Sequence, residues 1–425
     1  MRTGKASRHE RLLTLFERNV RASHKRGLSA LRVEDLNLDG AWITTGGRRL
    51  VNFGSCAYMG LNTDPRLKAA AKEAIDRFGP VFSSSTVYTS IGLYTELEER
   101  LRRIFHAHVV VPPTTTLGHL AALPVLIGEG DAVLVDSQAH STVHLATQIL
   151  MAQGISVTPL AHNDMDVLSA AVEDACSRFD KVWYLADGIY SMFGDVAPVA
   201  KIMDLVNRYD NLHVYFDDAH GFGWKGVNGR GWVLDAIPWH PRLVVAVSLA
   251  KSFGSGGAAL AFPDAAMAER VQMSGGTMVF SGPLHPAQLG AAVASADIHL
   301  SPELEERQAV LSHQIKLIKN GLLAADLPVV NTDATPLWFV KVGGSEQALE
   351  LGRRMMDDGF YLNFAAFPAV AVGQAGLRLT HTVYHTGQQI EAMIESLARN
   401  FRAIGGKPEI IFDISDHAMS RAEAS

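Results

Sequence analysis

Four short apolar runs in the middle of the chain constrain its fold more than any other feature. Segments with helical character lie between several of them, notably around residues 164–178 and 198–209. Short apolar strands that alternate with helices are typical of a mostly parallel sheet buried on both faces. The sequence therefore predicts an α/β fold. The runs are Ala132–Val135, Val182–Ala186, Leu212–Phe216 and Leu243–Leu249.

The segments on either side of this region indicate smaller parts. Residues 8–30 indicate an amphipathic helix, and residues 41–53 a hairpin around a Gly-Gly turn. After a long helix near 300–324, shorter strand-like and helical segments predict a small α+β domain. We divide the chain into an arm with the hairpin (1–55), a large domain (56–300), a small C-terminal domain (301–410) and a tail (411–425).

Polar side chains follow each of the four apolar runs. Ligands of open α/β sheets bind beyond the carboxyl ends of the strands, so we expect these side chains to share one site. The segments are Asp136–His140, Asp187–Met192, Asp217–His220 and Lys251.

Together these residues suit pyridoxal phosphate (PLP) chemistry. The amine of Lys251 can form a Schiff base with an aldehyde. The Asp217 carboxylate can keep a pyridine nitrogen protonated, so that the ring accepts electrons. His220 can donate to the phenolic oxygen of the cofactor, and His140 can stack on its ring. The combination of an acid and a later lysine predicts a PLP enzyme.

The phosphate of such a cofactor needs hydroxyls, backbone N–H groups and preferably a helix N-terminus. A threonine triplet before the apolar segment 117–126 offers all three, although such a triplet is also an ordinary helix cap. Two serines are further candidates. The candidate phosphate residues are Thr114, Thr115, Thr116, Ser248 and Ser281.

Other classes of function have weaker support. The net charge of −6 does not call for nucleic acid. Neither glycine cluster has the dinucleotide spacing, and we find neither zinc-ligand spacing nor a Gly-x-Ser-x-Gly elbow. The two cysteines favour a reducing cytoplasm. We also expect no secretory signal and no membrane span.

The motifs resemble those of the α-oxoamine synthases, PLP enzymes of fold type I. This family includes aminooxononanoate synthase, aminolevulinate synthase, 2-amino-3-ketobutyrate ligase, serine palmitoyltransferase and the autoinducer synthases. The resemblance implies a large domain with a mostly parallel seven-stranded sheet, and a homodimer with active sites at the subunit interface. Its strongest blocks are Asp187–Pro198, Asp217–His220, Gly229–Gly231, Ser248–Gly257, Phe280–Pro283 and Leu377–Thr386.

The resemblance also implies roles for single residues. Lys251 forms the Schiff base and later moves the Cα proton, while Asp217 pairs with the pyridine nitrogen. His220 and Ser191 hold the phenolic side of the cofactor, and His140 stacks on the ring.

Three further roles concern phosphate and substrate. Ser248 reaches the phosphate, and Ser281 does so from the other subunit of the dimer. Arg378 binds the carboxylate of the amino acid, a task that suits the planar guanidinium group.

Several segments depart from the family pattern. Thr114–Thr116 replaces the usual Ser/Thr-Gly-Tyr turn, and His119 stands where an Asn normally follows. Residues 83–89 resemble those of the autoinducer synthases more than those of the biotin-pathway enzymes, and Cys56–Tyr58 replaces Asn-Asn-Tyr. Because these segments shape the substrate pocket, the fold and the cofactor are better defined than the substrate.

The expected reaction is a decarboxylative condensation of a small amino acid with an acyl thioester of coenzyme A or of an acyl carrier protein. The products are an α-aminoketone, CO2 and the free thiol. Glycine, alanine and serine remain open as substrates, as does the acyl chain length. The alternatives are another fold type I reaction, such as transamination or aldol-type cleavage, and a non-catalytic partner subunit.

Overall fold

The computed structural model describes residues 7–406, which form two compact units. The larger unit contains residues 56–191 and 195–311. The described part of the smaller unit consists of residues 7–55, 192–194 and 312–406. The arm and the hairpin thus group with the C-terminal segments in one unit, whereas our division by sequence kept them apart.

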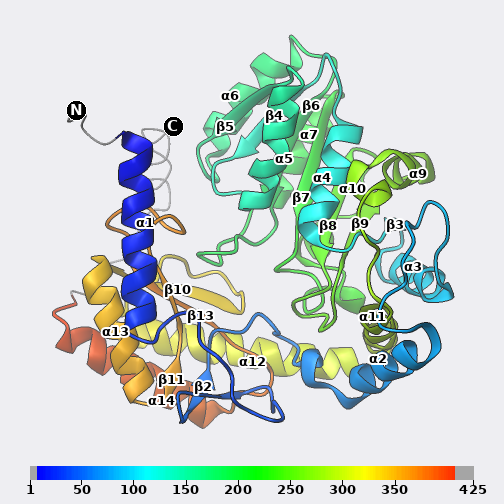
Figure 1. Cartoon of the computed structure of the whole chain (residues 1–425). Helices are drawn as coiled ribbons and strands as arrows, with labels where there is room; N and C mark the ends of the chain where they lie inside the picture. The colour runs from blue at the N-terminus through cyan, green and yellow to red at the C-terminus, as the bar shows by residue number, and fades with distance from the viewer. Residues whose placement is uncertain (1–6, 407–425) are drawn as a thin grey trace, which may run out of the picture. The chain divides into compact units, whose positions relative to one another are not determined.

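A seven-stranded sheet forms the centre of the larger unit, in the order β3-β9-β8-β7-β6-β4-β5 (Figure 1). The strands from β8 to β5 in this order are parallel, and β9 is antiparallel to both of its neighbours. The predicted mostly parallel sheet is therefore confirmed. The strands are β3 (His108–Val110), β4 (Ala132–Asp136), β5 (Ser156–Leu160), β6 (Val182–Asp187), β7 (Leu212–Asp217), β8 (Leu243–Ser248) and β9 (Ala258–Phe262).

The apolar runs arise because the sheet is buried on both faces. Every residue of β4, β6 and β8 is buried. Alternate residues of β8 enter different clusters: Val245 packs with the helices of one face, and Val244 with those of the other. A strand in such a position needs apolar side chains at successive positions, so it lacks the alternation of apolar and polar residues that marks a half-exposed strand.

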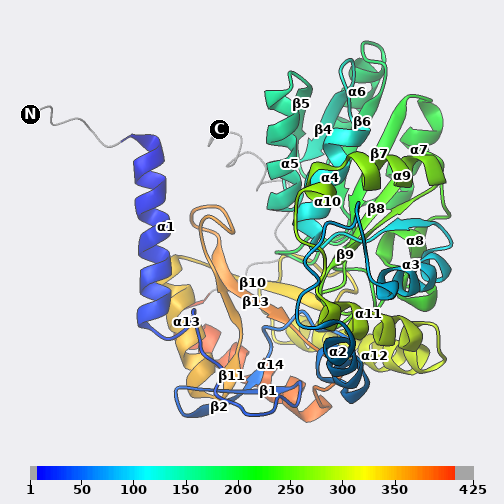
Figure 2. The same cartoon turned by 45° about the vertical axis from the view of Figure 1, so that its right-hand side comes forward.

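Helices cover both faces of this sheet, which Figure 2 shows from a second side. One face packs against α4 (Thr115–Leu126), α5 (Ser141–Ala152), α9 (Ala265–Ser274) and α10 (Gly276–Val279). The other face packs against α3 (Gly92–Phe105), α6 (Met165–Cys176), α7 (Val199–Arg208), α8 (Trp232–Ala236) and α11 (Pro286–His299). The unit also contains η1 (Leu61–Thr63), α2 (Pro65–Phe78) and η2 (Val227–Gly229), and α12 (Glu303–Ala324) begins in it.

The antiparallel strand β9 joins segments that lie far apart in the sequence. It pairs with β3 through Val109 and Ala261, about 150 residues later in the chain. Just beyond this pairing, the N–H of Ala258 donates to the carbonyl of Pro112 at 3.0 Å. The chain therefore enters α4 from a position that β9 fixes.

The smaller unit contains two three-stranded sheets, in the orders β1-β2-β11 and β10-β13-β12. The predicted hairpin is present, and both glycines of its turn, Gly46 and Gly47, have positive φ. The strands are β1 (Trp42–Thr45), β2 (Arg48–Asn52), β10 (Leu337–Gly343), β11 (Phe360–Tyr361), β12 (Asn363–Ala365) and β13 (Ala375–Thr380). The helices are α1 (Arg8–Lys25), α13 (Ser345–Asp357), α14 (Gly387–Ala403) and the end of α12. Across residues 7–406, we find no helix with both the length and the apolar character that a membrane crossing requires.

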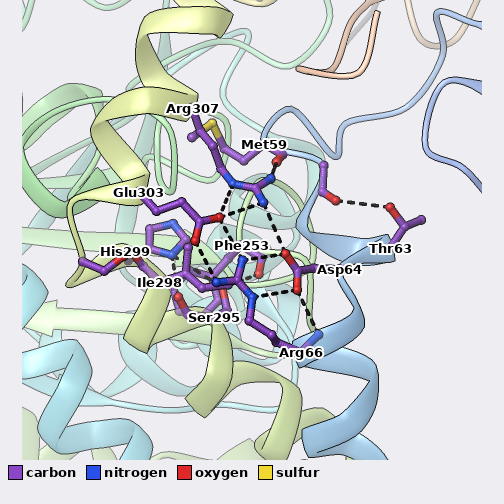
Figure 3. A network of polar contacts seen from close by, with 12 residues as sticks. Met59, Thr63, Asp64, Arg66, Phe253, Ser295, Ile298, His299, Glu303 and Arg307 are labelled. Atoms are coloured by element: carbon purple, nitrogen blue, oxygen red, sulfur yellow. Dashed lines mark hydrogen bonds and ion pairs between the residues drawn. The ribbon is translucent and has the colours of Figure 1, made fainter.

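A network of charged side chains links α2 to α12 within the larger unit (Figure 3). Asp64 caps α2 and pairs with Arg66 at 2.8 Å and with Arg307 at 3.2 Å. Glu303 binds the same two arginines, at 2.7 and 2.9 Å. The network thereby ties the first turn of α12 to the start of α2.

This network makes a contribution to stability that should depend on pH. Hydrogen bonds from Arg66 and Arg307 lower the pKa of Glu303 from 4.5 to about 2. A lowered pKa in the folded state stabilises the fold above the unfolded value, and this stabilisation is lost as the pH falls from about 4.5 toward 2. We expect Glu303→Gln to reduce the free energy of unfolding near neutral pH by about 1 kcal/mol, the scale of a partly exposed ion pair.

Urea unfolding of the wild type and the variant at several pH values tests this prediction. The difference between them should shrink as the solution becomes more acidic. Glu305→Gln is a matched control, since Glu305 is exposed on the same helical turn. An equal effect of both substitutions, or a difference that does not vary with pH, would contradict the prediction.

Candidate active site

A cavity of about 220 Å³ lies at the carboxyl ends of the parallel strands in the larger unit. Residues that follow β4, β6, β7 and β8 meet the N-terminus of α4 there. The sequence predicted this meeting from the position of each polar group directly after its strand. The lining residues are Thr114, Thr115, Thr116, His140, Thr142, Asp187, Ile189, Asp217, Ala219, His220, Ser248, Ala250, Lys251 and Gly257.

Three residues predicted for the site do not line this cavity. Ser191 is half-buried in the turn after β6. Ser281 follows α10, where its hydroxyl donates to the carbonyl of Thr277. Arg378 lies on β13 of the smaller unit. Their roles at the cofactor or substrate stay predictions.

Asp217, the last residue of β7, is a buried carboxylate with two hydrogen-bond donors. Its Oδ2 lies 3.0 Å from Nε2 of His119, and its Oδ1 accepts from the N–H of Ala219 at 3.0 Å. Burial acts to raise the pKa of Asp217, but the hydrogen bond from His119 and the charge of Lys251 outweigh it and lower the pKa to about 2. Asp217 is therefore ionised at neutral pH.

Asp187 is the neighbour of Asp217 in the sheet, because the two acids are register partners at the ends of β6 and β7. Its Oδ1 accepts from the N–H of His140 at 2.9 Å. Burial, and then the negative charge of Asp217, raise the pKa of Asp187 well above its usual range. Burial therefore favours the protonated form of Asp187, whereas Asp217 is ionised.

The two histidines of the cavity are held by hydrogen bonds to their rings. Nδ1 of His220 lies 2.8 Å from the hydroxyl of the buried Tyr58. Nδ1 of His140 lies 2.7 Å from the hydroxyl of Thr142, and burial lowers the pKa of His140. A neutral imidazole is therefore favoured at His140, which suits a ring that packs against a heteroaromatic group.

A glycine-rich turn positions Lys251 after β8. Gly254 has a φ of +75°, and a Cβ there would lie 2.6 Å from the backbone nitrogen of Asn62. The turn closes where the N–H of Ser255 donates to the carbonyl of Leu249 at 2.9 Å. A larger residue at position 254 would displace the segment that carries Lys251.

The opposite side of the cavity presents the start of α4. The hydroxyl of Thr114 caps this helix by accepting from the N–H of Leu117 at 3.1 Å. Thr115 and Thr116 add two hydroxyls to the first turn and line the cavity. Hydroxyls and free N–H groups at a helix N-terminus form a favourable environment for a phosphate.

A second buried network braces the turn that follows β6. His162 lies 2.8 Å from Oδ1 of Asp136 and 2.7 Å from Oδ2 of Asp195. Burial acts to lower the pKa of His162, but hydrogen bonds to the two carboxylates raise it to about 10. This imidazolium joins the end of β4 to the end of the Asp187–Asp195 turn.

No role for His119 or Tyr215 was expected from the sequence. The hydroxyl of Tyr215 lies 2.8 Å from Nδ1 of His119, so these residues form a chain that ends at Asp217. Two features of the sequence give the sides of β7 and α4 on which they lie, but not the distance between them. Tyr215 precedes Asp217 by two positions and shares its side of the strand, and His119 lies one helical turn after Thr115.

Comparisons with known proteins agree with this fold. The family model for aminotransferase class I and II matches residues 48–397. The 8-amino-7-oxononanoate synthase of Symbiobacterium thermophilum is 31% identical over 84% of this chain and 90% of its own length. A serine palmitoyltransferase of Bacteriovorax stolpii is 26% identical over 88% of this chain and 86% of its own.

A solved structure of the serine palmitoyltransferase from S. paucimobilis with bound PLP–myriocin aldimine has the same fold. Its TM-score is 0.82 at 24% identity, and the match covers 93% of this chain and 99% of that one. The predicted resemblance is thus confirmed, and the chain belongs to the aminotransferase class I and II family, among the relatives that include the α-oxoamine synthases.

Proposed function

We propose that the chain is a PLP-dependent α-oxoamine synthase. It condenses a small amino acid with an acyl thioester and releases an α-aminoketone, CO2 and the free thiol. The cavity in which Lys251, Asp217 and His220 lie together is the observation that carries the proposal. The relatives named 8-amino-7-oxononanoate synthase and serine palmitoyltransferase support the same reaction class.

The residues of the cavity fit PLP by their chemistry. An ionised Asp217 suits a protonated pyridine nitrogen, and Lys251 suits an aldehyde. The hydroxyls of Thr115, Thr116 and Ser248 suit a phosphate. When bound, PLP supplies an electron sink for negative charge at the substrate Cα.

Each side chain then has a defined task. With PLP bound, Asp217 would keep the proton on the pyridine nitrogen, and His220 would orient the phenolic oxygen. The amine of Lys251 takes the proton from the amino acid Cα. A C–C bond forms between this carbon and the thioester carbonyl, while the C–S bond breaks and the thiolate leaves. After CO2 is lost, Lys251 returns a proton to the same carbon.

We also propose that the enzyme is a cytoplasmic homodimer in which Ser281 reaches the phosphate of the other subunit. Both cysteines are free thiols, which supports a reducing compartment.

The dimer is supported by two exposed aromatic residues. Phe280 and Tyr88 are 90% and 83% exposed. Their segments are tied together by a hydrogen bond of 2.8 Å from Ser85 to the carbonyl of Val279. Exposed aromatic residues of this kind support an interface with a second copy, and a monomer in sedimentation experiments would contradict it.

The visible absorption of the purified protein during titration with PLP, and then with glycine, alanine and serine, tests the function. A coloured complex that responds to one amino acid is expected, followed by thiol release when an acyl thioester is added. Keto acid or aldehyde formation without a thioester would favour transamination or cleavage. A protein that stays colourless with PLP would favour the non-catalytic subunit.

Arg378→Ala should weaken binding of the amino acid, because the planar guanidinium is proposed to hold its carboxylate. Loss of a charge-assisted hydrogen bond predicts an affinity lower by roughly 10- to 100-fold. The amino acid dependence of the absorption change measures this affinity. Arg399→Ala, on the exposed side of α14, is the control. An unchanged affinity in the Arg378 variant would remove this residue from the proposed site.

A further inference from the structure

We infer that His119 is a positioning residue that fixes the negative charge of the Asp187–Asp217 pair on Asp217. The inference deepens the proposed function, and it rests on that function for the role of the charge. His119 is fully buried on α4 and does not line the cavity, so it acts through Asp217 and has no contact with substrate.

The first step concerns which of the two neighbouring acids, Asp187 or Asp217, carries the negative charge. Asp187 and Asp217 end neighbouring parallel strands in register, and both are almost fully buried. Ionisation of both buried acids is disfavoured, because the charge of one raises the cost of a charge on the other. The pair therefore shares a proton, and the surrounding donors decide which acid keeps it.

The donors around the two acids are unequal. Asp187 accepts from the backbone N–H of His140. Asp217 accepts from the backbone N–H of Ala219 and also from His119. Hydrogen bonds to a carboxylate favour its ionised form, so the additional donor from His119 places the charge on Asp217.

Tyr215 fixes which nitrogen of His119 carries the proton. An ionised carboxylate can only accept, so Nε2 of His119 donates to Asp217. In a neutral His119 ring, Nδ1 is then the acceptor for the hydroxyl of Tyr215, which is itself fully buried. Both ring nitrogens have a partner, and the donor toward Asp217 cannot rotate away without breaking the second hydrogen bond.

The location of the charge matters for the proposed cofactor. An Asp217 that carried the shared proton would not hold a proton on a pyridine nitrogen, although the shape of the cavity would be unchanged. A donor at position 119 is therefore required, but an imidazole is not the only group that can supply it. The side-chain amide of asparagine also donates through N–H, so His119→Asn should preserve the function that His119→Leu removes.

The test compares the wild type with His119→Leu, His119→Asn and Tyr215→Phe in two measurements. Titration with PLP, followed by absorption, gives the cofactor affinity. We expect His119→Leu to weaken it by roughly 10- to 100-fold, and His119→Asn to restore most of that loss. Tyr215→Phe should have a smaller effect in the same direction, because it removes only the group that orients the imidazole.

The second measurement is 13C NMR of the cofactor-free protein labelled at the aspartate γ-carboxyl groups. The signal of Asp217 is assigned with Asp217→Asn. At neutral pH we expect this signal to be that of a carboxylate in the wild type and in His119→Asn, and to move toward the protonated form in His119→Leu. This readout does not require PLP, so it separates the inference from the proposed function.

Three results would overturn the inference. One is a folded His119→Leu variant whose Asp217 stays ionised and whose PLP affinity is that of the wild type. Another is a His119→Asn variant as impaired as His119→Leu, since packing would then explain the role of His119. The third is a wild-type Asp217 that is protonated in the NMR spectrum. A wild type that shows the expected NMR pattern but binds no PLP would support the charge assignment and overturn the proposed function.

Discussion

Lys251→Ala is expected to abolish turnover and to leave the fold intact. The amine of Lys251 is the only group proposed both to form the Schiff base and to move the Cα proton. Loss of a positioned proton-transfer group alone costs about 10²- to 10⁴-fold in rate, and the loss of the nucleophile adds to it. Lys251 lies in the turn after β8 and belongs to no helix or strand, so the truncation removes no element of the core.

The rate of thiol release measures the loss of turnover, and the midpoint of urea unfolding shows whether the fold is intact. Lys251→Arg is the informative companion variant, because it keeps a positive charge near Asp217 but cannot form a Schiff base at neutral pH. Both variants should be inactive and folded. A rate within tenfold of the wild type in Lys251→Ala would show that the site has been assigned to the wrong lysine.

Asp217→Asn should have the second largest effect, with a fall in turnover of at least about 10²-fold. The substitution keeps the shape of the side chain but removes the charge that holds the proton on the pyridine nitrogen. The pKa of Asp217 is lowered to about 2, chiefly by His119 against the opposing effect of burial. Since the wild-type carboxylate is ionised at every pH above that value, its protonation should not set the acidic limb of the pH–rate profile.

Asp218→Asn is the matched control for this prediction. Asp218 is the next residue and equally buried, but its Oδ2 accepts from the N–H of Val233, and it does not line the cavity. Burial raises the pKa of Asp218 to about 8, so its charge is largely absent at neutral pH. Turnover per folded molecule should therefore change little. Equal losses in both variants would indicate damage to the turn rather than to the proposed cofactor site.

Four parallel strands of the sheet could be predicted from sequence, whereas the fully buried β9 was not among the predicted runs. The strands β4, β6, β7 and β8 are continuous apolar runs in the sequence because helices pack against both of their faces. The edge strand β5 was missed because only Leu160 is buried and Ser156 is exposed, so the segment lacks an apolar run. The strand β3 was missed because its three residues are too few to show a pattern.

The same contrast applies to the candidate site. Lys251, Asp217, His220 and His140 could be placed because each follows a strand directly, and parallel strands bring such positions together. The role of His119 could not be predicted, because it depends on how closely α4 approaches β7. Neither residue pattern nor spacing specifies that distance. Arg378 and Ser281 were assigned by resemblance, and their roles await the experiments above.

The pairing of β3 with β9 has a consequence for the order in which the site forms during synthesis. The threonines at the start of α4 leave the ribosome early, but the backbone at Pro112 is held by Ala258, the first residue of β9, which pairs with β3. A nascent chain that ends before Ala258 contains Lys251, Asp217 and the threonines, but it still lacks the residue whose N–H holds Pro112. Cofactor capture should therefore await a late, long-range closure, a slow class of folding event.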